Sequence, residues 1–477
     1  MENDTYVTPL SSRYASKEMN KVWSNNTKYS TWRKLWVALA ETERELGLDI
    51  SQEQINEMKE NIENIDYDIV NEREKECRHD VMAHIYEYGL KCPNAKPIIH
   101  LGATSCYVTD NSDIIIMREA LELIKQKIII VISNLRDFAD KYKGTPCLGY
   151  THFQPAQLTT VGKRATLWMQ DLLEDLQELE FVENNLKLLG CKGTTGTSES
   201  FMKLFKDEEK VKQIDEKIAE KIGFTKVFAV SGQTYTRKVD SRVLNCLAGI
   251  AESCSKFAND MRLLQHEKEL EEPFESKQIG SSAMAYKRNP MRSERINSLA
   301  RHIIVLSNDT KITSCTQWLE RTLDDSANKR ISVPESFLAT DAILKIYANI
   351  TSGIVVYENS IRANIMKEIP FMGTEEILMN AVLKGGDRQE LHERIRVHSM
   401  EAAKQVKEYG KPNDLVQRIA GDSSFGLTQD EILKILNPEN LCGRAKNQVR
   451  DFIEQEVNPV LEKYGDLIEG VNYQLSV

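Results

Sequence analysis

The sequence predicts an all-α protein built around a central bundle of long helices. Apolar residues recur at alternating steps of three and four along residues 114–142, 158–179 and 243–264. This spacing places them on one face of a long helix. No stretch of comparable length alternates between apolar and polar residues, as a half-buried strand would. Helices of this length are typical of a near-antiparallel bundle.

The first long helix is predicted to begin after Asn111 and Ser112 and to end before Gly144 and Pro146. Asparagine and serine are good N-caps, whereas glycine and proline end helices. The roughly thirty residues between these limits would span about 45 Å. The apolar seam consists of Ile114, Met117, Leu121, Ile124, Ile128, Val131, Leu135, Phe138 and Tyr142.

Two further seams predict two more long helices, and weaker patterns follow at 296–306 and 343–357. Residues beside the first seam, such as Ile115, Ile129 and Ile130, are also apolar. Because one bundle cannot cover helices that are apolar on two faces, we expect the chain to self-associate. The second seam is Leu158, Val161, Ala165, Trp168, Leu172, Leu176 and Leu179, and the third is Val243, Leu247, Ile250, Cys254, Phe257, Met261 and Leu264.

Three helical domains are predicted from the chain length and from changes in the helical pattern. At 477 residues the chain exceeds what one core usually serves. Residues 1–111 contain a separate amphipathic helix around Trp32 and Trp36 and form an N-terminal domain. Residues 112–364 hold the long helices, and residues 365–477 form a C-terminal domain of shorter segments interrupted by glycine and proline.

Composition fits a large globular enzyme of the cytoplasm. The net charge of −10 argues against nucleic acid or an anionic membrane as the main partner. The nine cysteines are dispersed without a Cys-x-x-Cys pair, which is typical of reduced thiols. The longest aliphatic run, 128–132, is far too short to span a bilayer, and the polar N-terminus is unlike a signal peptide.

The segment from Gly280 to Pro290 combines two serines, a lysine, an arginine and an asparagine within eleven residues. A serine hydroxyl acts as a base only when cations or hydrogen-bond donors stabilise its alkoxide. Lys287 and the N–H groups of a glycine-led loop could supply that stabilisation to Ser281. On composition alone, a solvated mobile loop between helices is the simpler interpretation of the segment.

Two polar clusters precede predicted helices near the N-terminal domain. In the segment 78–84, His79 and His84 are five residues apart and lie on different helix faces, which argues against a zinc site. A pair of surface histidines is the alternative to a binding role. In the segment 100–105, Thr104 and Ser105 suit either a helix cap or an anion at a helix N-terminus, and both roles can coexist.

Two more clusters flank the long helices further along the chain. His152 lies in a turn bounded by glycine and proline, where it can give or accept a proton near neutral pH. In the segment 317–330, Arg321 and Arg330 could clamp a carboxylate or phosphate, although surface ion pairs are the alternative. The glycine-rich segment 190–196 lacks the spacing of a phosphate-binding loop, and we expect a flexible turn there.

Taken together, these segments resemble one known family. The pattern Gly-Ser-x-x-Met-x-x-Lys-x-Asn at 280–289 is similar to the signature loop of the fumarase/aspartase superfamily, except that Ala285 stands where most members have proline. The segments 100–105, 151–157 and 320–327 resemble the adenylosuccinate lyases of eukaryotes in particular. The resemblance extends from Ser12 to Ala445.

The resemblance implies β-elimination of fumarate from adenylosuccinate and from succinylaminoimidazole carboxamide ribotide, without a metal or organic cofactor. Ser281 would be the general base and His152 the general acid. It also implies a homotetramer whose sites are each built by three chains. Residues implied to bind substrate are Arg13, Tyr14, Arg78, His79, Asp80, Thr104, Ser105, Thr151, Gln233, Lys287, Asn289, Arg295, Arg321, Ser326 and Arg330.

Two alternatives to this function remain open at the level of sequence. One is another fumarate-releasing lyase of the superfamily, such as argininosuccinate lyase. The other is a helical assembly protein that has the fold without the chemistry. The joint presence of Ser281, His152 and Lys287 argues against the second alternative.

Overall fold

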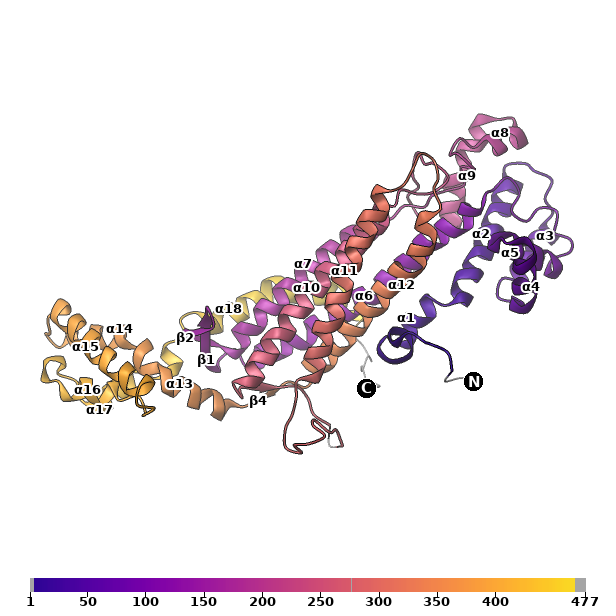
Figure 1. Ribbon diagram of the computed structural model, residues 1–477. Coiled ribbons are helices and arrows are strands. Elements are labelled where there is room, and N and C mark those ends of the chain that lie inside the picture. Colours follow the sequence, from indigo (N-terminus) through magenta and orange to yellow (C-terminus); the bar gives the residue numbers. More distant parts are fainter. Residues whose placement is uncertain (1–3, 276, 468–477) are drawn as a thin grey trace.

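The protein is an elongated, mainly helical molecule, seen here in a computed structural model that describes residues 4–275 and 277–467 (Figure 1). Long helices form its middle, the N-terminal helices lie at one end, and the C-terminal helices lie at the other. The all-α prediction is confirmed, since the described strands are short and form two two-stranded sheets. Among the described helices, none combines the length and the apolar character needed to cross a bilayer.

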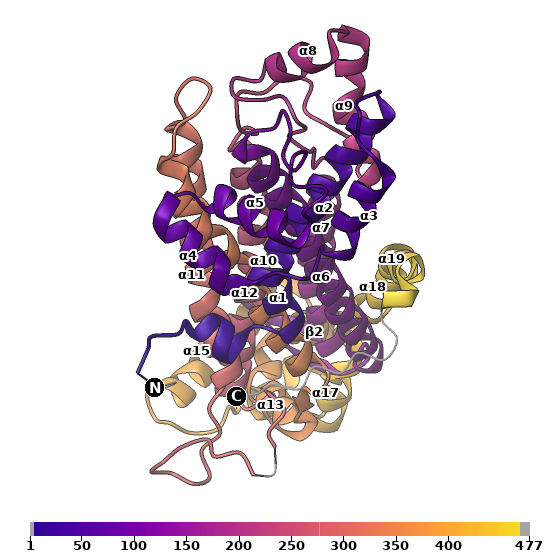
Figure 2. The same ribbon diagram turned by 90° about the vertical axis from the view of Figure 1, so that its right-hand side faces the viewer.

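Five long helices form the central bundle and run side by side (Figures 1 and 2). α6 packs against α7 and α12, while α10 packs against α7, α11 and α12. Successive helices run in opposite directions where short segments connect them, so each end of the bundle gathers helix ends from distant parts of the chain. Their bounds are α6 (Ser105–Lys141), α7 (Val161–Asn184), α10 (Lys238–His266), α11 (Met291–Cys315) and α12 (Asp324–Thr351).

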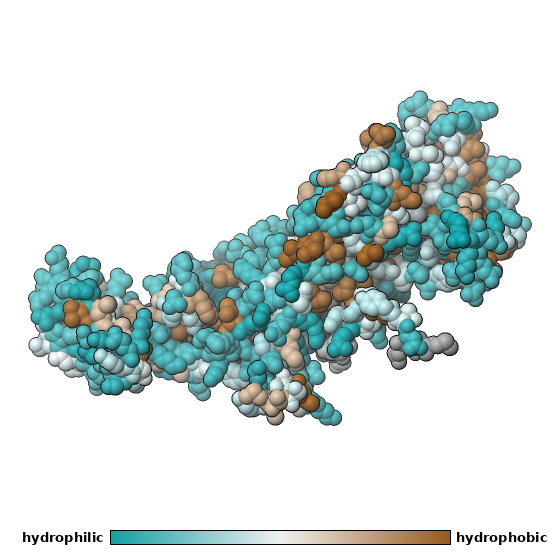
Figure 3. Space-filling model, in the orientation of Figure 1, coloured by the Kyte–Doolittle hydropathy of each residue, from teal (hydrophilic) through white to brown (hydrophobic). Residues whose placement is uncertain are grey.

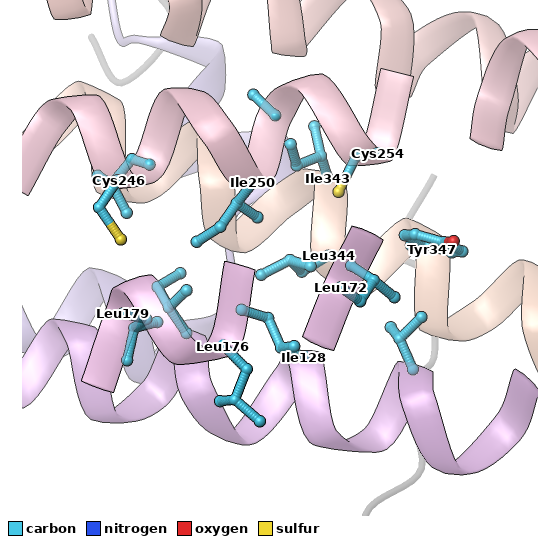
Figure 4. Packing of buried hydrophobic residues seen from close by; sticks show 14 of the residues in the cluster. Ile128, Leu172, Leu176, Leu179, Cys246, Ile250, Cys254, Ile343, Leu344 and Tyr347 are labelled. Atoms are coloured by element: carbon cyan, nitrogen blue, oxygen red, sulfur yellow. The ribbon is translucent and has the colours of Figure 1, made fainter. Parts of the chain in front are cut away.

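The bundle core consists of the seam residues that the sequence predicted. Ile128 of α6, Leu172 of α7, Ile250 of α10 and Ile343 of α12 point toward one another between the helices and are fully buried (Figure 4). Burying a side chain of this size contributes about 1.5–3 kcal/mol. The predicted first and third long helices are therefore confirmed, whereas Leu158 of the second seam lies in a strand before α7.

The start of the first long helix was predicted wrongly. α6 has 37 residues and begins at Ser105 with Thr104 as its N-cap, six residues before Asn111. Asn111 is buried inside the helix, where its side-chain amide bonds both polar backbone atoms of Gly190, at 2.9 and 3.1 Å. The 190–196 segment is therefore attached to α6 at its first residue, Gly190. Lys192, also buried, forms an ion pair with Asp215 at 2.6 Å.

The remaining helices cover the two ends of the bundle. The division at 111/112 and 364/365 stays a prediction, and both limits fall inside helices, the first in α6 and the second in α13 (Glu358–Met372). The N-terminal elements are η1 (Leu10–Tyr14), α1 (Lys17–Val22), α2 (Asn25–Glu45), α3 (Gln52–Glu60), α4 (Tyr67–Cys77) and α5 (Asp80–Lys91), with α8 (Glu199–Phe205) and α9 (Glu208–Lys221) beside them.

The last helices return from the C-terminal end to the bundle, where α18 packs along α7 (Figure 1). The C-terminal elements are α13 (Glu358–Met372), α14 (Thr374–Leu383), α15 (Arg388–Lys407), α16 (Leu415–Gly421), η2 (Ser423–Phe425), α17 (Gln429–Ile435), η3 (Pro438–Asn440), α18 (Ala445–Phe452), η4 (Ile453–Val457), α19 (Asn458–Lys463) and η5 (Gly465–Leu467).

A β-hairpin that the sequence analysis did not predict connects α6 to α7. Strands β1 (Pro146–Thr151) and β2 (Gln154–Thr160) pair antiparallel, with an irregularity between Leu148 and Tyr150. The second small sheet pairs β3 (Leu270–Glu271) with β4 (Val355–Val356). It closes the same end of the bundle as the hairpin, next to the segment that leads into α11 (Figure 1).

Candidate active site

Three helix N-termini meet at the end of the bundle that adjoins the N-terminal helices. His79 caps α5 by accepting a hydrogen bond from the Met82 N–H at its Nδ1 (3.3 Å), and its Nε2 lies 3.3 Å from Ser105 Oγ at the start of α6. Arg330 in the first turns of α12 pairs with Asp80 at the start of α5, at 2.9 Å. Because the N-terminus of a helix carries partial positive charge, this convergence suits an anion.

We call this group the arginine cluster. Most of the predicted binding residues belong to it. The sequence alone could not show that they meet, because Asp80 and Arg330, for example, are 250 residues apart. Burial alone would raise the pKa of Asp80, but the Val81 N–H and the Arg330 guanidinium bring it below its usual range. Asp80 therefore stays ionised and keeps Arg330 in place. The members are Arg78, His79, Asp80, Thr104, Ser105, Gln233, Arg321, Ser326 and Arg330.

The segments carrying Gln233 and Arg321 are tied to each other. The Gln233 N–H donates to the carbonyl of Glu320 at 3.0 Å, and Cys106 Sγ donates to Gln233 Oε1 at 3.4 Å. Gly232 allows this approach, because a Cβ there would lie 2.5 Å from the Glu320 carbonyl oxygen. These bonds therefore connect three segments: the start of α6, the segment around Gln233 and the residues just before α12.

Three further predicted residues, two in η1 and one in α11, lie close together. The ring of Tyr14, in η1, is within 5.4 Å of the Arg295 guanidinium and within 6.0 Å of that of Arg13. Cationic groups over an aromatic face attract its quadrupole. The structure therefore brings Arg13, Tyr14 and Arg295 together, apart from the arginine cluster.

His152 occupies the tip of the hairpin, as the predicted turn implied. His152 and Phe153 both have left-handed backbones, with φ of 54° and 56°, and form the two-residue loop between Thr151 and Gln154. Two positive φ values match the twist of a tight hairpin, although glycine or asparagine usually supplies them. Thr151, His152 and Phe153 are exposed, so the imidazole is presented to whatever approaches this end of the bundle.

The signature loop surrounds the Ser281 oxygen with donors. Ser281 Oγ accepts hydrogen bonds from the N–H groups of Met284, at 3.1 Å, and Ala283, at 3.4 Å. Asn289 Nδ2 donates to the Gly280 carbonyl at 2.7 Å and so closes the loop at its base. Donors aimed at an oxygen lower the free energy of its anionic form, which favours an alkoxide at Ser281.

A buried carboxylate anchors the loop to α11. Glu272 accepts hydrogen bonds from the Arg292 N–H at 3.1 Å and from the Ser293 N–H and hydroxyl at 2.6 Å each. The Arg292 guanidinium donates to the carbonyl of Pro273 at 2.5 Å. The two ends of the loop are thereby held together while the residues around Lys287 stay exposed.

The structure does not bring the proposed acid, base and arginines together in one chain. The hairpin and the signature loop lie at one end of the bundle, and the arginine cluster lies at the other (Figures 1 and 2). α12, which has the cluster at its start, has 28 residues, equivalent to about 42 Å. One chain therefore carries two separated groups of site residues.

Six charged residues at or beside the arginine cluster were not predicted from the sequence. Lys329 of α12 is buried beside Asp113 at 3.1 Å, and Arg237 pairs with Asp110 and Asp325. Burial lowers the pKa of the Lys28 ammonium, which lies near Asp80 and Arg330. No local signal distinguishes these residues, because a buried charge looks like a surface charge until its distant partner is known. The described residues contain no group of three metal-ligating side chains placed to hold an ion.

Comparison with known proteins gives the class to which the fold and site belong. A family profile described as lyase matches residues 6–305. The fold is shared with the fumarate lyase of Mesorhizobium sp. BNC1, with a TM-score of 0.79 and 19% identity, covering 95% of this chain and all of the other. It is shared also with the 3-carboxy-cis,cis-muconate lactonizing enzyme of Pseudomonas putida, at TM-score 0.80 and 20% identity. The protein is thus a member of the fumarase/aspartase superfamily of lyases.

The particular family follows from closer relatives. A profile described as adenylosuccinate lyase C-terminus matches residues 370–452. The adenylosuccinate lyase of Saccharomyces cerevisiae is 51% identical and that of Schizosaccharomyces pombe is 48% identical, each over 99% of both chains. The adenylosuccinate lyase of Schistosoma mansoni is 47% identical over 98% of both. The chain belongs to the adenylosuccinate lyase family.

We predict that Ala285→Pro leaves activity intact or lowers KM slightly. Ala285 is exposed, and its N–H donates no hydrogen bond to the described residues. We expect the loop 275–289 to close over substrate, and proline would reduce the ordering entropy of that step by about 0.4–1 kcal/mol. Steady-state kinetics on the variant measures the effect.

The matched control for this variant is Ala283→Pro. Ala283 donates its N–H to Ser281 Oγ, so proline there removes a donor from the proposed base and should lower kcat. Complete loss of activity in Ala285→Pro would mean that the loop backbone does not have the geometry assigned to it, and the placement of Ser281 would need revision.

Proposed function

We propose that the protein cleaves adenylosuccinate to AMP and fumarate, and succinylaminoimidazole carboxamide ribotide to the corresponding carboxamide ribotide and fumarate. The observation that carries the proposal is the Ser281 oxygen held by two N–H donors in a loop with the Gly-Ser-x-x-Met-x-x-Lys-x-Asn pattern. Membership of the adenylosuccinate lyase family supplies the substrate class. No step of the reaction requires a cofactor.

The elimination divides into two proton transfers around one broken bond. Ser281, as alkoxide, removes the proton beta to the substituted nitrogen, and the electron pair of that C–H bond delocalises into the adjacent carboxylate. Lys287 and the donors of the loop stabilise the added charge. The electron pair then forms the double bond of fumarate as the C–N bond breaks, and His152 protonates the leaving nitrogen.

The arginine cluster suits the anionic ends of such substrates. Arg321 and Arg330 offer guanidinium groups that bond phosphate or carboxylate through two parallel N–H donors. Thr104, Ser105 and Ser326 add hydroxyls beside the N-termini of α6 and α12. This local positive charge is set against a chain of net charge −10, so binding depends on the cluster rather than on the overall field.

A homotetramer with sites shared between chains would unite the two groups of site residues. Antiparallel packing of two bundles places the hairpin end of one chain beside the arginine cluster of another. Apolar side chains are exposed along the long helices, among them Phe181 of α7 and Val305 and Ile312 of α11. Figure 3 shows such residues gathered over the upper part of the bundle, where a second copy would bury them.

An ultraviolet assay with adenylosuccinate tests the proposed function directly, because AMP and fumarate can both be followed as they appear. Argininosuccinate serves as the control substrate, since it shares the succinyl group but lacks the nucleotide. We expect fumarate from the first and none from the second. Release from argininosuccinate alone would assign the chain to another activity of the superfamily. The predicted cytoplasmic location is tested separately, by fractionation of cells that express the protein.

Both natural substrates should be turned over by the same site. Their succinyl and phosphate groups are identical, so only the pocket for the base has to accept two shapes. Purified protein should release fumarate from adenylosuccinate and from succinylaminoimidazole carboxamide ribotide, and each should inhibit competitively the turnover of the other. Turnover of one substrate without the other would disprove the shared base pocket.

A further inference from the structure

A line of four alternating charges runs from the interior of the protein to the arginine cluster. Arg237 Nη1 donates to Asp110 Oδ2 at 2.8 Å, and its Nε donates to Asp325 Oδ2 at 2.5 Å. The other oxygen of Asp325, Oδ1, accepts from Arg321 Nη1 at 2.8 Å. We call Asp110, Arg237, Asp325 and Arg321 the charge relay.

The relay becomes more exposed toward the site. The side chains of Arg237 and Asp325 are 2% and 0% exposed, whereas that of Arg321 is 24% exposed. Both hydrogen bonds that Arg321 makes within the described part of the chain use Nη1, one to Asp325 and one to the carbonyl of Thr322. Its Nε–H and second amino group are left for a ligand, and an anion there would continue the alternation of charge.

Stability alone is a weak explanation for this arrangement. Taking several charges out of water is costly, and buried ion pairs are often replaceable by apolar residues without loss of stability. What the pairing does secure is geometry. Arg237 holds one oxygen of Asp325, so the carboxylate cannot turn, and the second oxygen is fixed toward Arg321. Burial alone would raise the pKa of Asp325, but the guanidinium groups of Arg237 and Arg321 hold it below its usual range.

The relay also aligns the Gln233 segment with α6. Asp110 Oδ2 accepts a hydrogen bond from the Tyr235 N–H at 3.0 Å, two residues after Gln233. Asp110 belongs to the same helix that begins at Ser105. The relay therefore connects the three segments that carry Ser105, Gln233 and Arg321.

We propose that Asp325, held by Arg237 and Asp110, is a positioning residue that fixes the Arg321 guanidinium for the anionic substrate. The proposal rests on the proposed function only in taking Arg321 as a substrate-binding residue. Asp325 touches no substrate itself, so its effect must pass through Arg321. This dependence separates a positioning role from a purely structural one.

A double-mutant cycle of Asp325→Asn and Arg321→Gln tests the dependence. Asparagine keeps the size of the side chain but loses the charge that both arginines bond. We expect Asp325→Asn alone to raise KM for adenylosuccinate about tenfold or more, because hydrogen bonds to charged groups are strong. We expect kcat to change by less than about threefold, since binding rather than chemistry is affected.

In the Arg321→Gln background, Asp325→Asn should change KM by less than about twofold, since the residue it positions is gone. The same factor in both backgrounds would overturn the proposal, because Asp325 would then act independently of Arg321. The wild-type rate with adenylosuccinate, measured on parallel preparations, reports on the proposed function by itself.

Two further variants complete the design. Glu87→Gln is the matched control, because Glu87 forms a fully buried ion pair with Arg33 and neither residue is a member of the arginine cluster. It should lower the unfolding midpoint and leave KM unchanged. Asp110→Asn acts one step further from the substrate and keeps Arg237 on Asp325, so it should raise KM less than Asp325→Asn does. A larger effect from Asp110→Asn would contradict the order of the relay.

Discussion

Ser281→Ala and His152→Gln should each lower kcat by about 10²–10⁴-fold, the usual contribution of a positioned base or acid. Ser281→Ala removes the oxygen that the Ala283 and Met284 N–H groups surround. His152→Gln removes the titratable group from the hairpin tip. Both side chains lie outside the buried core, so neither change should unfold the protein, and circular dichroism of each variant checks this.

Mixing the two inactive variants should restore activity if the sites are shared. When subunits exchange at random, up to about a quarter of the sites combine an intact Ser281 from one chain with an intact His152 from another. The physical reason is that the family resemblance implies sites built by three chains, with Ser281 and His152 contributed by different chains although both lie at the same end of one bundle (Figure 1). The measurement is fumarate release after exchange has been verified with labelled subunits.

The control for this mixture pairs Ser281→Ala with the double variant that also carries His152→Gln. No chain in that mixture has an intact Ser281, so no activity should return. If the first mixture also stays inactive after verified exchange, the two residues act from one chain and the shared-site assembly is wrong. The assay on the wild-type protein would still decide the reaction.

Glu43→Gln should stabilise the protein by about 3 kcal/mol at pH 7. Glu43 of α2 is 0% exposed, and neither carboxyl oxygen has a hydrogen-bond partner among the described residues. Burial raises its pKa from 4.5 to about 9. Unfolding exposes a carboxyl that ionises above pH 4.5, so this group favours unfolding increasingly as pH rises from 4.5 to 9.

The stabilisation by Glu43→Gln should depend on pH. Below pH 4.5 the carboxyl is protonated in both states, and the glutamine variant should gain nothing from it. The gain in unfolding midpoint, at fixed protein concentration, should therefore grow from pH 5 to pH 9. Glu41→Gln is the matched control, because Glu41 lies on the same helix but pairs with Lys59 at 2.5 Å and is partly exposed. A gain that is constant with pH would contradict the buried ionisation.

How much of the fold follows from sequence depends on how local the signal is. The seam around Ile128 and Ile250 predicted long helices, because helical periodicity needs no knowledge of the rest of the chain. The sequence predicts a cap at Asn111, because an asparagine side chain can either cap a helix or bond a loop. Here a loop 79 residues away decides its role. The hairpin at His152 lacks the Asn-Gly or Asp-Gly signal of a two-residue turn.

The candidate site, like the fold, was predictable from sequence only where the signal is local. Ser281, Lys287 and the residues of the arginine cluster were found through resemblance of short segments. Arg237 was missed, although its guanidinium holds two aspartates in the interior. Its partner Asp325 lies 88 residues further along the chain, and only the packed structure shows that the charges meet.

In the proposed assembly, a single chain does not possess an active site of its own, because its two groups of site residues lie at opposite ends of α12. A change at its hairpin and a change at its arginines would impair different sites, in company with different neighbours. In a cell that makes two defective versions of the chain, the outcome would depend on which segments are damaged. Two lesions in segments that serve different sites could compensate each other, while two lesions in the same segment could not. The effect of a defect in one chain could then not be inferred from that chain alone.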